Sequence, residues 1–354
     1  MISEESISIE WIEQVSANNN KADKILVEKV VRALSLLESL VISGCPFIFK
    51  GGTALMLHLN SSKRLSIDID IISPTYIDFT PFFQMVIENS NFIRYELNER
   101  SSDMNIPKAH VKFFYEPTYI TSQQEEYILL DILFEKAQYA KLIELNIDSP
   151  FIKQDGKLLS VNVPSIEDML GDKLTAFAPN TTGIPYIKNG NSKTMEIIKQ
   201  LYDIASLFDR ITDATITTTT FKKFAQTEQG YRNQTIDHKQ VLNDIFQTAL
   251  CISTRGSDGN GDFDALMRGI TQVRSFVFSE NYQIDKATVA ASKAAYISTL
   301  IGSEATTIIR FQNQNQVTDW VIEQPFNTKL NKLRKSIPEA FFYWYQTYLL
   351  IKFR

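Results

Sequence analysis

The spacing of apolar residues in this 354-residue chain changes once, near Ser165, and this change constrains the fold more than any other feature. Before Ser165, short apolar runs and alternating stretches such as residues 67–72 (IDIDII) predict strands interleaved with helices. After it, apolar residues recur with the spacing of a helix almost to the end. Length alone suggests roughly two domains. We therefore predict an α/β domain over residues 1–163 and an all-helical domain over residues 164–354 that completes a cleft.

The first half has a readable order of elements. A helix is expected over residues 22–43, with Gly44 as its stop, followed by a short strand, PFIFK, a Gly51-Gly52-Thr53 turn and a second helix. Further strands are predicted near residues 67–72, 92–98, 109–115, 126–134 and 158–164, with a helix near 79–90. Beyond them, SIEDMLGDKLTAFA and TMEIIKQLYDIASLFD predict two helices separated by a loop near residues 179–192.

Composition narrows the class of protein. Hydrophobic residues make up 44% and charged residues 22%, which are ordinary globular values. Two distant cysteines, Cys45 and Cys251, predict neither a disulfide framework nor a zinc site. No apolar run reaches membrane-spanning length and the N-terminus is acidic, so we expect a cytoplasmic protein without a membrane partner. The net charge of -5 argues against a general basic coat for nucleic acid, although a local basic patch stays open.

The stretch richest in chemistry is Lys50-Gly51-Gly52-Thr53 followed by an acidic strand. Residues i and i+2 of a strand share a face, so Asp68 and Asp70 are expected to project side by side. Two close carboxylates suit a hard cation such as Mg²⁺, whose other ligands are water and substrate phosphate. The two glycines allow a phosphate to approach the backbone, and the following helix offers free N–H groups. Alone, each element has a simpler explanation as a polar strand face or a capped turn; their combination is harder to dismiss.

This combination resembles the nucleotidyltransferase superfamily, which pairs a GG[ST] turn with a DxD strand and a third carboxylate on a later strand. Asp131, the lone charge in YILLDILF, is the candidate for the third carboxylate, with a strand-end turn as the simpler alternative. A buried unpaired carboxylate is costly, so Asp131 should have a cation near it.

More narrowly, KGGTALMLHL and RLSIDIDI resemble the AbiEii/AbiGii toxin family of type IV toxin–antitoxin systems, which is related to the MenT toxins. The strand motif matches at Arg64, Ser66, Asp68 and Asp70. Lys173 matches a helical lysine motif, and Lys199 with Asp203 matches a KDxxDL-like helix. Gln200 stands where that pattern has its first acid, so the role of that acid is in doubt. The resemblance covers residues 45–210, and the remainder matches nothing that we can name.

Helical spacing tests two of these residues independently. Lys173 falls within the apolar stripe of Ile166, Met169 and Phe177, so its ammonium needs an anionic partner from protein or substrate. Asp203 instead falls on a polar face with Lys199, which by itself predicts solvent exposure and an i,i+4 pair.

The resemblance implies an α/β fold of nucleotidyltransferase type with a small mixed sheet, and a toxin that transfers NMP from an NTP. Asp68, Asp70 and Asp131 would hold Mg²⁺ or Mn²⁺, with Asp131 as third ligand or as base. Lys50, Gly51, Gly52, Thr53, Arg64 and Ser66 would bind the nucleotide, while Lys173 and Asp203 would complete the catalytic set.

The resemblance also implies which molecule accepts the nucleotide and which protein partners the toxin. The resemblance implies tRNA as acceptor, an abortive-infection role and a cognate antitoxin that need not bind the toxin directly. The alternatives are a nucleotidyltransferase for a small molecule such as an antibiotic, and a catalytically silent nucleotide-binding protein. If tRNA is the acceptor, the lysines and arginines at 222–223 and 329–335 are the expected contacts.

Overall fold

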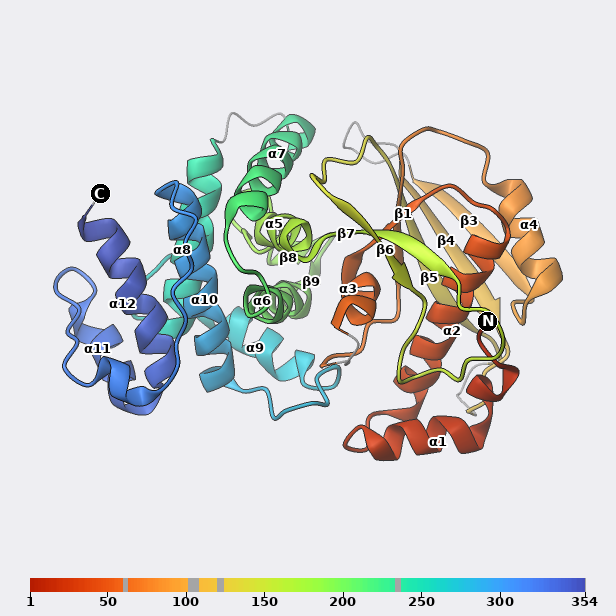
Figure 1. Cartoon of the computed structure of the whole chain (residues 1–354), viewed down its shortest axis with the longest axis horizontal. Coiled ribbons are helices and arrows are strands. Elements are labelled where there is room, and N and C mark those ends of the chain that lie inside the picture. The colour runs from red at the N-terminus through yellow and green to blue at the C-terminus, as the bar shows by residue number, and fades with distance from the viewer. Residues whose placement is uncertain (60–62, 101–107, 120–123, 233–236, 354) are drawn as a thin grey trace. The chain divides into compact units, whose positions relative to one another are not determined.

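The computed structural model describes residues 1–59, 63–100, 108–119, 124–232 and 237–353. They form two compact units (Figure 1). The first contains Met1–Ser165 and Ser275–Asn281, and the second contains Ile166–Arg274 and Tyr282–Arg354. The sequence division assigned residues 275–281 to the helical half. They join the first unit because their backbone pairs with the segment before the DxD motif, where the Leu65 N–H donates to the Phe276 carbonyl over 2.8 Å.

A five-stranded mixed sheet forms the centre of the first unit, in the order β1-β2-β5-β4-β3. Strands β2 and β5 are parallel, whereas β1–β2, β5–β4 and β4–β3 are antiparallel. This confirms the predicted small mixed sheet. The strand bounds are β1 Ile48–Lys50, β2 Ile69–Ser73, β3 Arg94–Arg100, β4 Lys108–Tyr115 and β5 Glu126–Phe134; a separate pair consists of β6 Leu142–Asn146 and β7 Ser160–Pro164.

Helices cover one face of this sheet. Strand β4 alternates strictly between half-buried and buried residues, and its buried side includes Phe113. The Phe113 ring contacts Phe83 of α4 with centroids 5.3 Å apart, and Arg32 of α2 lies over Tyr115. The apolar side of the sheet therefore packs against α2 and α4, and the polar side does not. Helical elements of this unit are η1 Glu4–Ile7, α1 Ile9–Asn18, α2 Lys24–Ile42, α3 Gly51–Leu59 and α4 Thr80–Asn89.

The second unit is helical in its described residues apart from two two-residue strands. Helix α10 packs against α8, α12 and α6, and α5 packs against α7 and α6 (Figure 1). The bounds are α5 Ile166–Ala176, β8 Ile187–Lys188, β9 Asn191–Ser192, α6 Thr194–Phe208, α7 Thr215–Arg232, α8 His238–Ser253, α9 Phe263–Val273, α10 Ile284–Gly302, η2 Gln314–Val317, α11 Asn327–Ser336 and α12 Pro338–Lys352.

The ends of α2 follow the sequence signals. The Asp23 side chain accepts from the Leu26 N–H and caps the helix, and Gly44 just beyond its end has a φ of 74°. Strand β6 was not predicted from the sequence. It is half-exposed along its length and has no strong apolar pattern, so only its pairing with β7 reveals it.

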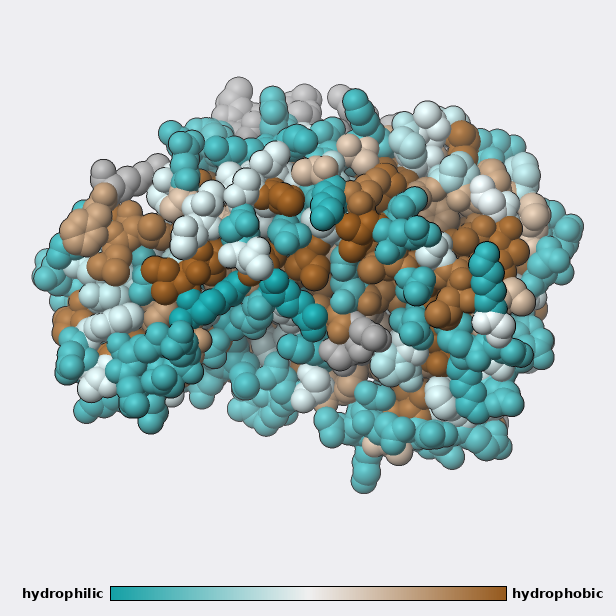
Figure 2. All heavy atoms as spheres, viewed as in Figure 1, coloured by the Kyte–Doolittle hydropathy of each residue, from teal (hydrophilic) through white to brown (hydrophobic). Residues whose placement is uncertain are grey.

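The surface mixes polar and apolar residues. On the face shown in Figure 2, hydrophilic residues dominate the lower edge, and apolar residues appear in several separate areas. None of the helices in the described part of the chain is both long enough and apolar enough to cross a membrane.

Candidate active site

The double-glycine turn consists of Gly51 and Gly52, the first two residues of α3 directly after β1, and polar side chains pack closely against it. Gly51 has a φ of 80°, and a Cβ built there would lie 2.0 Å from the Asp70 Oδ2. A Cβ at Gly52 would lie 2.5 Å from the Ser66 Oγ and 2.8 Å from the Arg64 Nη2. A side chain at either position would collide with these groups. The glycines are therefore required for Asp70, Ser66 and Arg64 to lie against the turn, whether or not a phosphate approaches it.

A row of polar side chains crosses the sheet next to this turn. Lys50 pairs in register with Asp70, Asp70 with Asp131, and Asp131 with His110, on β1, β2, β5 and β4 in that order. Register partners on neighbouring strands present their side chains to the same face, and adjacent strands lie about 4.8 Å apart. We call Lys50, Asp70, Asp131 and His110 the polar row. It brings together three of the residues singled out from the sequence.

Asp68 differs from Asp70 in its setting. It lies one residue before β2, so the expected strand starts two residues later than the alternation predicted, and its side chain is exposed. The Thr53 hydroxyl, which is fully buried, donates to the Asp68 carbonyl over 2.6 Å. Thr53 thus fixes the backbone at Asp68. Because this hydroxyl is buried and already donates, we do not retain Thr53 as a phosphate ligand.

Arg64 lies beneath the turn. It is 8% exposed, and its Nη1 donates to the Leu65 carbonyl over 3.0 Å. Ser66 is half-buried, with its N–H directed at the Met56 sulfur 3.1 Å away. Arg64 and Ser66 therefore hold the segment that leads into the acidic strand and support the backbone of the turn.

Asp131 has a partner that the sequence did not reveal. It is the sixth residue of nine in β5 and 36% exposed, so both the strand-end alternative and the expectation of burial are wrong. The His110 Nδ1 lies 2.6 Å from the Asp131 Oδ1. An ionised carboxylate can only accept, so with Asp131 ionised Nδ1–H is the donor. The outward alternation of β4 could have placed His110 on the polar face, but pairing it with Asp131 required the β4–β5 register.

The carboxylates of the site suit a divalent ion that is bound with the substrate. Among the residues described by the structure, no group of three or more His, Cys, Asp or Glu side chains could hold a metal ion. Mg²⁺ is usually bound through one or two carboxylates, with water and substrate phosphates completing its shell. Asp68 and Asp70 are hard oxygen donors two residues apart, exposed and half-buried respectively. This donor set fits such an ion, and within the described parts of the chain it does not belong to a closed three-carboxylate cage.

The helical unit holds the other two candidates together. The Lys173 Nζ of α5 lies 2.9 Å from the Asp203 Oδ2 of α6, with side-chain exposures of 11% and 1%. The predicted burial of Lys173 and its need for an anion are confirmed. The predicted exposure of Asp203 is wrong. The face of α6 that appeared polar from its residues packs against α5, and Asp203 neutralises the buried ammonium there.

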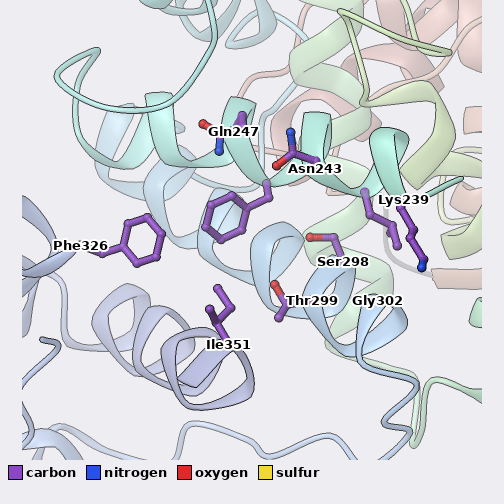
Figure 3. Close-up of a pocket in the computed structure, with 10 residues that line it drawn as sticks. Lys239, Asn243, Gln247, Ser298, Thr299, Gly302, Phe326 and Ile351 are labelled. Atoms are coloured by element: carbon purple, nitrogen blue, oxygen red, sulfur yellow. The ribbon is translucent and has the colours of Figure 1, made fainter. Parts of the chain in front are cut away.

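A separate pocket of about 340 Å³ lies in the helical unit (Figure 3). Figure 3 shows Asn243 and Gln247 of α8 on one side, Ser298 and Thr299 of α10 on another, and Phe326 and Ile351 nearby. None of the residues predicted for the active site lines this pocket.

Comparisons with known proteins identify relatives of this chain. Residues 32–275, more than half of the chain, match the family described as nucleotidyl transferase AbiEii toxin, Type IV TA system. No curated protein matches. Among solved structures, a protein from H. pylori assigned as a nucleotidyltransferase aligns with 80% of this chain and 96% of its own, at 14% identity and a TM-score of 0.39.

Proposed function

Because the chain belongs to the AbiEii family of nucleotidyltransferase toxins of type IV toxin–antitoxin systems, we propose that it transfers NMP from an NTP to tRNA. The observation that carries the chemistry is the polar row. It aligns a lysine, two carboxylates and a histidine across four strands beside the double-glycine turn.

In the proposed reaction, the turn and Lys50 bind the triphosphate. The N–H groups at the start of α3 and the Lys50 ammonium offer donors and positive charge to phosphate oxygens. Arg64 and Ser66 lie against Gly52 and stabilise the conformation of the turn. Positioning and charge neutralisation provide most of the catalysis in phosphoryl chemistry, so a rigid turn matters as much as the charges.

Asp68 and Asp70 would hold Mg²⁺, which neutralises triphosphate charge when bound. We assign Asp131 to the acceptor, because one of its oxygens already receives the His110 hydrogen bond. In this assignment Asp131 accepts the proton of the acceptor hydroxyl. The resulting alkoxide attacks the α-phosphorus of the NTP, and the bond to pyrophosphate breaks. Lys173 and Asp203 both match family motifs, so we include them in the proposed catalytic set.

Support for tRNA as the acceptor comes from the family resemblance and from exposed lysines. Lys329, Lys332 and Lys335 are exposed on α11. Arg334 differs, because its Nη1 donates to the Trp320 carbonyl over 2.8 Å and so has a structural role. Lys332 and Lys335, and not Arg334, are therefore the residues to reverse in charge when RNA binding is tested. Each phosphate contact that they make would add about 0.7 to 0.9 to the slope of log affinity against log salt.

The test is incubation of the purified protein with each labelled NTP, Mg²⁺ and total RNA. A labelled RNA of tRNA size, absent with Asp70→Asn, supports the proposal. If label instead enters a small molecule, and transfer is insensitive to salt, the acceptor is a small molecule. Absence of any labelled product with all four NTPs, together with retained NTP binding, would indicate a silent nucleotide-binding protein.

The biological setting follows from these substrates. NTPs and tRNA are cytoplasmic, so we place the protein in the cytoplasm. Its toxicity would be countered by a cognate antitoxin, either by direct binding or by acting on the same target. Co-expression of the wild type and of Asp70→Asn with a candidate cognate antitoxin tests this. Toxicity that persists with Asp70→Asn would contradict a catalytic origin.

A further inference from the structure

The polar face of strands β3, β4 and β5 is partly exposed and continues the polar row. On β4, Lys112 and Phe114 are half-buried, whereas Val111, Phe113 and Tyr115 point to the opposite face and are buried. Tyr127 on β5 is 37% exposed. The aromatic packing of α2 and α4 is on the opposite face, and from α2 the Lys29 Nζ reaches to 5.8 Å from the Tyr127 ring. The outward residues therefore form a surface outside the aromatic core of the first unit.

This surface interleaves aromatic rings and cations. Phe114 and Tyr127 are register partners, with ring centroids 5.8 Å apart. The Arg94 guanidinium lies 3.6 Å from the Phe114 ring, and the Lys112 Nζ lies 4.4 Å from the Tyr127 ring. We call Arg94, Lys112, Phe114 and Tyr127 the aromatic platform. Aromatic rings and guanidinium planes are the groups on which unpaired bases stack, and nearby cations contact the phosphates.

Two features suit the aromatic platform to this purpose. The Arg94 Nε and Nη2 both donate to the Glu125 Oε2, over 3.1 and 2.6 Å, and its Nη1 donates to Glu96. These bonds hold the guanidinium over the Phe114 ring as a second flat surface. Glu96 is the register partner of Lys112, but its ion pair among the described residues is with Arg94, so the Lys112 charge is available to a phosphate. Because the glutamates offset Arg94, stacking should contribute more to affinity than charge does.

The platform is continuous with the site. Tyr127 and Asp131 both point outward from β5, four residues apart, which corresponds to about 13 Å along a strand. A stacked single strand advances 3.4 Å per nucleotide, so about four nucleotides span this distance. A strand whose bases rest on the Arg94 guanidinium and on Tyr127 can thus bring its terminal hydroxyl to Asp131.

We infer that the aromatic platform binds the unpaired end of a nucleic-acid acceptor and leads its terminal hydroxyl to Asp131. The inference rests on the proposed function, because it names the surface by which that reaction would hold its acceptor. It also explains how an acidic protein can bind nucleic acid, since stacking requires little net charge.

The test measures binding without NTP, so that it does not depend on transfer. A fluorescein-labelled, unstructured single-stranded RNA of about twelve nucleotides is titrated with the full-length protein, and anisotropy gives Kd. Tyr127→Ala should weaken binding about five- to 150-fold, the range for loss of one stacked base. Tyr76→Ala is the matched control, because Tyr76 is 70% exposed in the same unit but off the platform, and it should leave Kd unchanged.

Lys112→Gln should reduce the salt slope by about 0.7, while the control Lys157→Gln, at an exposed lysine, should not. A duplex of the same sequence should bind more weakly than the single strand, because its bases are already stacked. Equal loss from Tyr127→Ala and Tyr76→Ala, tighter binding of the duplex, or no binding of the single strand would each overturn the inference.

These outcomes separate the inference from the proposed function. If the wild type binds the single strand through Tyr127 but labels no RNA, the proposed function fails and the platform stands. If the wild type labels RNA and Tyr127→Ala changes neither binding nor transfer, the platform is wrong and the proposed function stands.

Discussion

The candidate residues occupy two contrasting settings, the polar row of the α/β unit and the buried pair of the helical unit. Asp131 of the polar row is 36% exposed and Asp70 is half-buried, so water and ligands can reach these carboxylates. Asp203 is 1% exposed, and its charge is balanced inside the protein by Lys173. The carboxylates of the polar row are thus accessible to a substrate. In the helical unit, Lys173 and Asp203 form an ion pair with each other.

This difference separates activity from stability. Half-exposed carboxylates cost little to keep in the folded protein, and neutralising one should change chemistry rather than folding. Charges removed from water depend on each other, because loss of one leaves the other uncompensated. A family match at both places therefore does not imply that substitutions at the two places will behave alike.

The largest effect on activity is expected from Asp70→Asn. It removes one charge from the polar row, so nucleotidyl transfer should fall about 10²- to 10³-fold or more, while thermal stability is unchanged or slightly higher. Asp68→Asn should behave in the same way. Transfer assays with Mg²⁺, paired with thermal melts, give both readouts. Near-normal turnover of either variant would remove that carboxylate from the metal site.

Lys173→Met should affect both stability and activity. Loss of the ammonium removes the cation that Lys173 supplies to the buried Asp203 carboxylate, which costs about 3–5 kcal/mol in the free energy of unfolding. Urea titrations of Lys173→Met and of Lys173→Met with Asp203→Asn provide the comparison.

The double variant distinguishes the two roles of Lys173. It should regain most of the lost stability, because the buried carboxylate charge is removed together with the ammonium. If Lys173 also serves catalysis, transfer by the folded double variant should stay about 10²-fold below wild type. Recovery of transfer along with stability would identify the pair as structural only.

His110→Ala should have an intermediate effect. It removes the donor that orients the Asp131 carboxylate, and loss of such a positioning group typically costs about 10- to 100-fold in activity. We expect the loss in kcat, with the KM for NTP unchanged. His110→Asn keeps a donor close to the Nδ1 position and should restore part of the rate. Equal activity of both variants with wild type would remove the histidine from the site.

Lys293→Met should have the smallest effect and is the matched control for Lys173→Met. Lys293 is 7% exposed in its side chain, but its partners Asp209 and Glu339 are 47% and 37% exposed. When the lysine is lost, water can solvate both carboxylates, so the loss of stability should be smaller than for Lys173→Met, and transfer should not change.

The stability difference between wild type and Lys293→Met also has an expected pH dependence. Burial lowers the pKa of Lys293, but Asp209 and Glu339 outweigh it, so the pKa is raised above its usual value. A raised lysine pKa stabilises the fold below the unfolded pKa and loses this contribution as pH rises through the folded one. The stability difference between wild type and Lys293→Met should therefore be constant from about pH 7 to 9. A difference that shrinks within this range would contradict the ion-pair assignment.

Several features of the site could be predicted from local sequence. The alternation of IDIDII placed Ile69 and Ile71 in the core and Asp70 toward the site, because side chains alternate along a strand. The apolar stripe of α5 predicted a buried Lys173, because residues three and four apart share a helix face. Both inferences needed only the period of one element.

Other features needed the fold. Asp203 was predicted to be exposed because a helical wheel shows which side is polar, but not that α5 packs against that side. His110 had no sequence signal for its pairing with Asp131, because register joins residues 21 positions apart. Residues 275–281 likewise join the first unit through backbone bonds, which carry no side-chain pattern.

The sequence by itself thus determined the class of fold, the double-glycine turn, the acidic strand and the family, since each depends on residues close together in the chain. Only the tertiary structure decided which ionisable groups face each other. It aligned Lys50, Asp70, Asp131 and His110 across four strands, and it buried Asp203 against Lys173. The physical reason is that solvation and charge pairing depend on what packs against a residue, and those neighbours come from distant segments.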